Sequence, residues 1–328
     1  MGETDTDAAD QFDARISPTK FDEGTPGLWR RYRKLPRNVF AISLVSLLND
    51  ASSEIIYPLL PLFLSLTLGA SPGIVGLIEG AAESVSSLLK LFAGYFSDRR
   101  GKRKAFVVLG YSLASLARPL LAFATSWYQV LAIRLTDRVG KGIRSAPRDA
   151  MIADTVALDE RGLAFGFHRA MDHSGAVVGP LIGYLLVMLF AADRNSPSAS
   201  DFTKIFLLAS IPALAAVLVV TFFVREADKP TIPRDKQVSN PVKISARGLD
   251  GNFKRFLLLV ALFTLSNSSD AFLILRAQTA GVSVTTIPLL WAMLHVSKVM
   301  TSLVGGDLSD RLGRRRLIVS GWMLYAAV

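Results

Sequence analysis

The segment GYFSDRRGKRK, residues 94–104, returns later in the chain as GDLSDRLGRRR, residues 306–316. Both copies hold a glycine, the triplet Ser-Asp-Arg, a second glycine and a closing basic run at identical offsets, 212 positions apart. Each copy follows one long apolar block and precedes another. A segment that recurs in this way predicts two related units joined in one chain.

The apolar residues are collected in long blocks, and they make up 51% of the 328 residues. A helix that crosses the ~30 Å hydrocarbon core of a bilayer needs about 20 apolar residues. Because backbone polar groups find no partners in lipid, such blocks must be helices. We therefore predict an all-α, polytopic transmembrane bundle. Its spans are expected at residues 38–67, 74–97, 105–125, 128–148, 162–190, 204–224, 254–278 and 284–308, with a ninth beginning at residue 317.

The composition excludes several classes of protein. The formal net charge is +10, but the basic residues lie between the apolar blocks, so we expect no nucleic-acid partner. The chain has no cysteine, which excludes thiol catalysis, disulfides and cysteine-based zinc sites. It holds no HExxH, Gly-x-Ser-x-Gly or P-loop motif. We expect neither an enzyme nor a bound cofactor or metal.

The loops between the predicted spans alternate between basic and nearly uncharged. Since basic loops stay in the cytoplasm, this alternation places the N-terminus there. We interpret residues 1–37 as a disordered cytoplasmic tail, 38–224 as a six-helix bundle, 225–253 as a cytoplasmic linker and 254–328 as the start of a second bundle. The compact loops suit a bacterial plasma (inner) membrane, in which we expect a monomer.

Both copies of the repeat resemble the signature of the major facilitator superfamily, a glycine followed by Asp-Arg, a second glycine and basic residues. The resemblance implies two six-span halves, alternating access and a small-molecule solute as the transported partner. Members normally have twelve spans, whereas this sequence stops at Val328, about twelve residues into the ninth. We therefore expect either a fragment or a truncated gene that lacks spans 10 to 12.

The resemblance also implies a latch at the cytoplasmic ends of the spans. In the first copy, Asp98 is expected to cap the N-terminus of a neighbouring helix or to pair with Arg144 or Arg148 of span 4. The second copy would repeat this arrangement with Asp310. The predicted gate residues are Gly94, Asp98, Arg99, Gly101, Arg144, Arg148, Gly306, Asp310, Arg311 and Gly313.

Charged residues inside the predicted spans are costly in lipid and by default mark function. Counting ~1.5 Å per residue along spans 1 and 4 places Glu54 level with Arg134, and Asp50 near Arg138. We therefore expect these two ion pairs across a central cavity. Buried ion pairs that only fix the register of the helices are the competing interpretation. The predicted cavity residues are Asp50, Glu54, Glu83, Arg134, Arg138, Lys141 and Asp172.

These cavity residues suggest two kinds of chemistry. Carboxylates buried beside a movable cation can take up and release protons, so the four acidic residues are candidate proton carriers. The basic residues Arg134, Arg138 and Lys141 could instead bind an anionic substrate, because guanidinium groups suit carboxylate and phosphate.

The segment GAVVGPLIG, residues 175–183, resembles the glycine-proline motif of the superfamily's proton antiporters. Gly175, Gly179 and Gly183 share one helix face beside Pro180, so close helix packing alone would also explain them. The resemblance favours antiport and hence export. We therefore predict proton-coupled efflux of a small polar or charged solute. Uptake or exchange of an organic or phosphorylated anion or a metal chelate, and a non-transporting sensor or scaffold, are the alternatives.

Overall fold

The structure, a computed structural model, describes residues 28–193, 197–226, 250–266, 280, 282 and 286–327. This part of the chain is helical, which confirms the all-α prediction. The predicted tail up to residue 27 and most of the predicted linker, 227–249, lie outside the described residues. The helices are α2 (Leu28–Arg33), α3 (Arg37–Ile56), α4 (Leu60–Leu62), η1 (Phe63–Thr67), α5 (Pro72–Arg100), α6 (Arg103–Ala117), η2 (Arg118–Phe123), α7 (Trp127–Thr155), η3 (Leu158–Glu160), α8 (Arg161–Phe190), α9 (Ala199–Phe222), α10 (Gly251–Ser266), α12 (Ile287–Leu312) and α13 (Arg314–Ala327).

Helix ends follow local sequence signals. The glycines that close the two copies of the repeat, Gly101 and Gly313, have φ values of 62° and 86°, which glycine adopts without steric strain. Each therefore separates two consecutive helices at the same position of the repeat. The N-terminus of α9 is held by a capping box, in which Ser198 and Asp201 satisfy each other's backbone N–H groups.

The first predicted span is broken rather than continuous. Helix α3 ends at Ile56, and a turn over residues 57–59 precedes α4 and the π-helical turn η1. Pro58 lies in this turn, where a proline lacks the N–H of a helical hydrogen bond and clashes with the preceding turn. The proline in the sequence explains the break.

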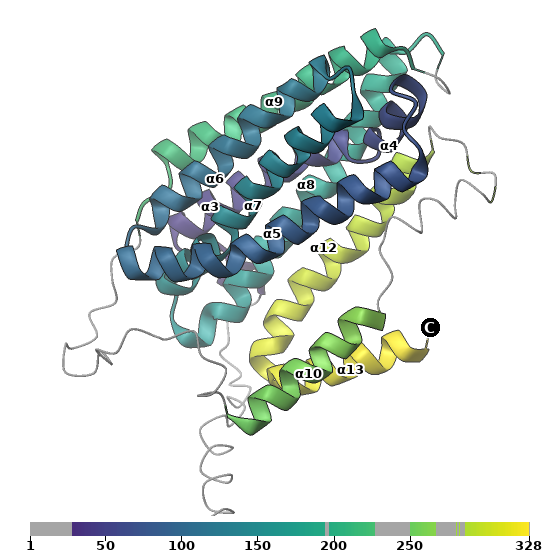
Figure 1. Ribbon diagram of the computed structural model, residues 1–328. Coiled ribbons are helices and arrows are strands. Elements are labelled where there is room, and N and C mark those ends of the chain that lie inside the picture. The colour runs from purple at the N-terminus through teal and green to yellow at the C-terminus, as the bar shows by residue number, and fades with distance from the viewer. Residues whose placement is uncertain are drawn as a thin grey trace, which may run out of the picture.

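The long helices pack in an order different from their order in the sequence (Figure 1). α5 and α6 both pack against α7, α9 packs against α6 and α3, and α3 packs against α8. α12 lies along α8, which joins the second copy of the repeat to the helices that precede it. α10 and α13 meet through the stacked rings of Phe263 and Trp322, whose centroids are 4.9 Å apart.

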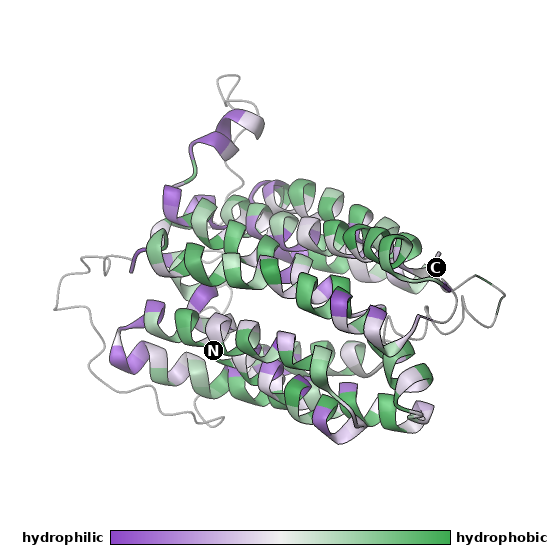
Figure 2. Ribbon diagram, turned by 90° about the horizontal axis from the view of Figure 1, so that it is seen from above, coloured by the Kyte–Doolittle hydropathy of each residue, from purple (hydrophilic) through white to green (hydrophobic). Residues whose placement is uncertain are grey.

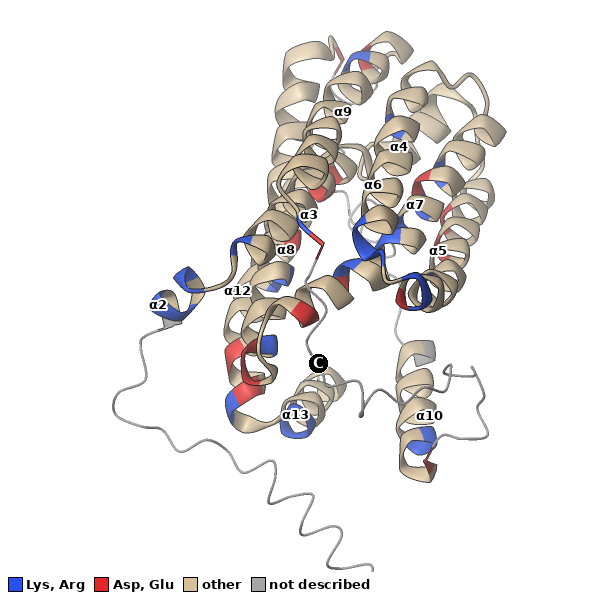
Figure 3. Cartoon of the chain, turned by 90° about the vertical axis from the view of Figure 1, so that its left-hand side faces the viewer, with Lys and Arg blue, Asp and Glu red and all other residues tan. Residues whose placement is uncertain are grey.

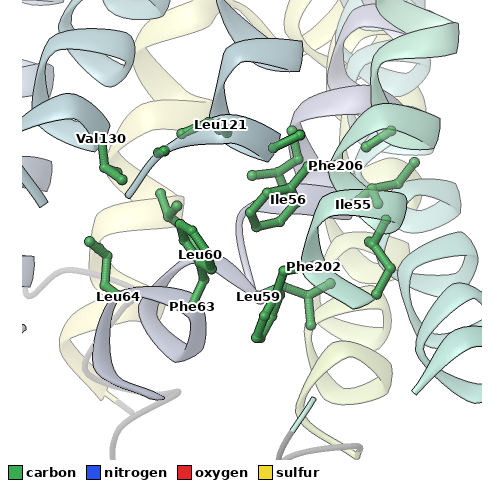
Figure 4. Packing of buried hydrophobic residues seen from close by; sticks show 14 of the residues in the cluster. Ile55, Ile56, Leu59, Leu60, Phe63, Leu64, Leu121, Val130, Phe202 and Phe206 are labelled. Atoms are coloured by element: carbon green, nitrogen blue, oxygen red, sulfur yellow. The ribbon is translucent and has the colours of Figure 1, made fainter. Parts of the chain in front are cut away.

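Two clusters of buried apolar side chains occupy opposite ends of the bundle. One lies where α3 leads into α4, and Figure 4 shows Leu60, Phe63 and Phe206 among its members. The rings of Phe63 and Phe206 meet edge to face, with centroids 5.3 Å apart. The other lies at the end of the bundle where α5 leads into α6 and α12 leads into α13, and we call this end the basic end. Val39, Met151 and Leu163 belong to this second cluster. Buried charged residues of η2 and α7, among them Arg118, Asp137 and Arg144, lie between the two clusters.

The outer surfaces of the helices are largely apolar (Figure 2). Exposed residues such as Leu91 and Phe222 are 70% and 74% accessible, as expected for side chains that face lipid. Five described segments are long and apolar enough to cross a membrane: Arg37–Thr67, Arg103–Phe123, Leu158–Phe190, Ala199–Phe222 and Pro288–Leu312. α5 and α7, with 29 residues each, are also long enough, but charged residues interrupt them.

Candidate functional site

A layer of charged side chains lies between the two apolar clusters. Figure 3 shows charged segments on α5 and α7 on one side, and on α3, α8 and α12 on the other. The layer contains all seven predicted cavity residues together with Glu79, Arg118, Asp137, Arg144 and Arg148. Helix α7 supplies half of them, because its charged residues recur along one stripe.

The most buried ion pair joins Arg118 and Asp137. The Arg118 Nε atom donates to Asp137 Oδ1 at 3.1 Å, and the two side chains are 5% and 7% exposed. The remaining guanidinium nitrogens donate to the backbone oxygen and the side-chain oxygen of Asn49, both at 2.9 Å. This group ties η2, α7 and α3 together. This ion pair was not predicted from the sequence. The available signal was the presence of these two charged residues within apolar spans.

Arg134 pairs with α5, not with α3. Its Nε and NH2 atoms donate to the Glu79 carboxylate at 2.7–3.1 Å. Glu54 instead accepts a hydrogen bond from Trp291 Nε1 of α12 at 2.8 Å. The predicted pair between Glu54 and Arg134 is therefore wrong. The reason is that α7 packs against α5 over much of its length and against α3 only locally.

The second predicted pair, Asp50 with Arg138, is wrong as well. Asp50 accepts a hydrogen bond from Asn49 Nδ2 at 2.9 Å and lies within electrostatic reach of Asp172 on α8. Arg138 forms no ion pair within the described part of the chain, and its Nε atom is buried without a hydrogen-bond partner. The rotation of each helix about its axis, which residue counting does not reveal, decides these partners.

Asp172 connects α8 to the end of α7 that lies at the basic end. Its carboxylate is 3.9 Å from Arg148 and 3.4 Å from Arg169. Arg148 also pairs with Asp149 at 3.0 Å and donates to Ser46 Oγ on α3 at 3.2 Å. Arg148 thus contacts three helices at once.

Three cations of the layer lack acidic partners within ion-pair distance among the described residues: Arg138, Lys141 and Arg144. The Arg144 guanidinium lies 4.4 Å from the centre of the Tyr111 ring, while its Nε and NH1 atoms are buried and unpartnered. Glu83 is exposed on α5, within electrostatic reach of Arg138 and Lys141. Buried guanidinium nitrogens without partners are energetically costly, which makes this stripe of α7 a candidate binding surface.

The first copy of the gate sequence is arranged differently from the prediction. Asp98 pairs with Arg103 at 2.9 Å, so the expected partners Arg144 and Arg148 are wrong. Arg103 also pairs with Asp154 at the end of α7. Gly94 approaches the Ala146 side chain, and Arg99 lies near the Tyr95 hydroxyl.

A carboxylate absent from our predictions holds the start of α6. Glu226, just after α9, accepts hydrogen bonds from the backbone N–H groups of Arg103 and Lys104, both at 2.9 Å. A negative charge at a helix N-terminus satisfies free N–H groups and complements the helix dipole.

The second copy of the gate sequence holds α8. Asp310 Oδ2 accepts the backbone N–H of Leu163 at 2.9 Å, which is the capping form of the predicted latch. Gly306 lies against Gly166, where a Cβ on either glycine would approach a Cα of the other within 2.9 Å. Only glycine permits this close approach between α8 and α12.

Helix α2 joins the same contact. Asp307 forms ion pairs with Arg31 and with Arg311, the latter at 2.7 Å. The Tyr32 hydroxyl donates to the Leu303 backbone oxygen at 2.9 Å. Burial and the Asp307 carboxylate raise the pKa of Tyr32, so this phenol stays a donor. The sequence had offered no signal for these α2 contacts.

The predicted glycine stripe of α8 packs against α3. A Cβ at Gly179 would lie 2.6 Å from the Ala51 oxygen, and one at Gly183 would lie 3.2 Å from the Ile55 oxygen. Gly175 faces the Leu47 oxygen, and Pro180 is buried within α8. The stripe therefore brings the backbones of α3 and α8 close together, beside Asp50 and Asp172.

Comparisons with known proteins agree with this architecture. Residues 42–328 match the family model described as Major Facilitator Superfamily. An uncharacterized MFS-type transporter of Methanocaldococcus jannaschii is 35% identical over 302 residues, which cover 90% of this chain and 72% of that protein. A multi-drug resistance efflux pump PmrA homolog of Lactococcus lactis is 28% identical and is covered over 69% of its length.

A solved structure shares the fold. A bacterial homologue of the human lysosomal transporter Spinster superposes with a TM-score of 0.62 at 20% identity. The match covers 89% of this chain and 63% of that one. The repeat, the intramembrane charge layer and the extent of these matches lead to one conclusion: the chain belongs to the Major Facilitator Superfamily of secondary membrane transporters.

Proposed function

We propose that the protein exports a small polar or charged solute in exchange for protons. Asp50 and Glu54 carry the proposal, because both lie in the charged layer and neither has a cationic partner within ion-pair distance among the described residues. Two neighbouring carboxyl groups such as Asp50 and Asp172 disfavour simultaneous ionisation. One proton can therefore be held between α3 and α8 and released when their separation changes.

Export is the proposed direction. The glycine stripe that brings α8 against α3 resembles the antiporter motif. Several relatives are named for multidrug resistance, including the efflux pump PmrA homolog of Lactococcus lactis and the multidrug resistance protein MdtG of Yersinia enterocolitica, which is 24% identical. We also propose that the basic end is cytoplasmic, since the arginines of both repeat copies gather there and basic loops stay in the cytoplasm.

Proton movement in proteoliposomes tests this proposal. The full-length protein is reconstituted with an internal pH dye, and cationic, neutral and anionic solutes are added under an imposed pH gradient. We expect solute-dependent proton efflux or influx that Asp50→Asn and Glu54→Gln abolish. Glu160→Gln, which changes an exposed carboxylate of η3, is the matched control and should leave the flux unchanged. Wild-type flux in both Asp50→Asn and Glu54→Gln would overturn the carboxylate mechanism.

Proton-coupled uptake or exchange of an anion is a second candidate. The stripe of Arg138, Lys141 and Arg144 favours it, because these cations have no acidic partner within ion-pair distance among the described residues. An anionic group would satisfy the buried, unpartnered nitrogens of Arg138 and Arg144. An anion that binds there neutralises cations, so we expect the anion and protons to cross the membrane in the same direction. Flux that moves solute and protons in the same direction, and that Arg138→Gln abolishes, would replace the export proposal with this one.

A further inference from the structure

A cavity of about 450 Å³ lies at the basic end, between α8 and α12. Its polar lining consists of Arg161 and Arg169 of α8, Ser302 and Ser309 of α12, and Arg314, the first residue of α13. The cavity meets the charged layer at Arg169, which pairs with Asp172, and the transport mechanism proposed above assigns no role to the cavity-lining residues.

The three arginines keep most of their hydrogen-bonding capacity free. Arg161 donates from Nε to the Ala153 backbone oxygen at 3.3 Å, which leaves its other two nitrogens available. Arg169 is half exposed and has a long ion pair of 3.4 Å with Asp172. Arg314 is exposed and forms no ion pair within the described part of the chain.

Two acidic residues near the cavity already have partners. The Asp310 carboxylate accepts the Leu163 backbone N–H, and Asp307 is held by Arg31 and Arg311. Asp159 and Glu160 of η3 are exposed. The Ser302 hydroxyl already donates to the Lys298 backbone oxygen at 2.7 Å. The cavity therefore presents three guanidinium groups and the Ser309 hydroxyl, a set of donors that suits a phosphate.

We propose that this cavity binds the phosphate of an anionic phospholipid headgroup. Basic pockets between transmembrane helices on the cytoplasmic side are suited to such headgroups. Phe165 lines the cavity, and the exposed Leu158 and Leu312 lie nearby on η3 and at the end of α12, so apolar surface is available for acyl chains. A bound lipid is held from both sides, because its donors come from α8 and from α12 and α13. Lipid binding therefore stabilises the arrangement in which these helix ends touch.

Lipid titration of the delipidated full-length protein tests this inference. The protein in detergent is titrated with phosphatidylglycerol, with phosphatidylcholine and with inorganic phosphate, and bound lipid is counted by native mass spectrometry. We expect phosphatidylglycerol to bind more tightly than phosphatidylcholine. The double variant Arg161→Gln/Arg314→Gln should weaken phosphatidylglycerol binding about 30-fold. Each arginine near the headgroups is expected to contribute a factor of roughly ten or less to the affinity.

Two controls keep the inference falsifiable. Arg315→Gln/Arg316→Gln removes the same charge from exposed neighbours that do not line the cavity and should leave binding unchanged. Arg161→Lys/Arg314→Lys keeps the charge and should retain most of the binding, even if the glutamine variants fail to fold. Equal losses in the two glutamine pairs would show that general surface charge attracts the lipid and would overturn the site. Tight binding of inorganic phosphate without preference for lipid would overturn the lipid assignment.

Discussion

The carboxylate of Asp310 accepts the backbone N–H of Leu163 at 2.9 Å, so a residue near the end of α12 caps the first turn of α8. Its repeat counterpart Asp98 pairs with Arg103 of the next helix instead. Two aspartates at equivalent positions of the repeat thus have different partners. Their contributions to the packing of the helix ends can therefore be separated by substituting one aspartate at a time.

Removal of the Asp310 cap should loosen the contact between α8 and α12. Loss of a helix cap costs about 1 kcal/mol, so Asp310→Ala should reduce the population with touching helix ends about fivefold. Spin labels on cysteines introduced at Leu158 and Leu312 would report the distance, and residues 1–328 contain no cysteine that would compete for the label. Asp98→Ala is the matched control. A distance distribution that changes equally in both variants would contradict the prediction.

Loss of one partner from the Arg118–Asp137 pair should destabilise the fold strongly. Asp137→Ala leaves the Arg118 guanidinium buried with only Asn49 as partner, at a cost of about 3–5 kcal/mol. Thermal unfolding in detergent measures the effect. Glu79→Gln should be milder, since the Glu79 side chain is 31% exposed. The apolar double variant Arg118→Met/Asp137→Leu should recover part of the loss, and a melting temperature that Asp137→Ala leaves unchanged would refute the prediction.

Added methyl groups on the glycine stripe should separate α3 from α8 in a graded way. Gly179→Ala places a Cβ 2.6 Å from the Ala51 oxygen and should destabilise the protein by roughly 1–3 kcal/mol. Gly183→Ala, at 3.2 Å from the Ile55 oxygen, should have a smaller effect. Gly80→Ala on α5 meets nothing within 4 Å and should be neutral or slightly stabilising. Equal melting temperatures for all three would rule out the close-packing role.

Trp291 should report the ionisation of Glu54. A protein that keeps Trp291 while Trp29, Trp127 and Trp322 are replaced by Phe has a single indole, hydrogen-bonded to Glu54 at 2.8 Å. Protonation of Glu54 weakens this charge-assisted bond, so the emission of Trp291 should change with pH. Glu54→Gln should remove that change.

The nearby His295 ring can also alter the emission of Trp291, because the two ring centres are 4.9 Å apart. His295→Gln is therefore the required control and should preserve the transition that depends on Glu54. A pH response that survives Glu54→Gln but disappears in His295→Gln would assign the signal to the histidine instead.

The spans were predictable because an apolar block is a local signal, whereas the partners of buried charges were not. Residue counting placed Arg134 opposite Glu54, yet Arg134 binds Glu79 because α7 faces α5. Depth follows from counting residues, but the rotation of a helix depends on all its neighbours. The break after Ile56, by contrast, could have been predicted from Pro58. The contacts of α2 and of Trp291 depend on residues more than 230 positions away, for which one sequence offers no signal.

At Gly166 and Gly306 two main chains touch with no side chain between them. Side chains that interlock across a helix contact must change rotamer before the helices can rotate relative to each other. A contact between two backbones requires no such rotamer change. This point therefore has the geometry of a pivot. From Gly166 to Phe190 the helix extends ~36 Å, so a tilt of about 10° around the pivot displaces its far end by ~6 Å. A small angular change at one end of the bundle would therefore become a larger displacement at the other.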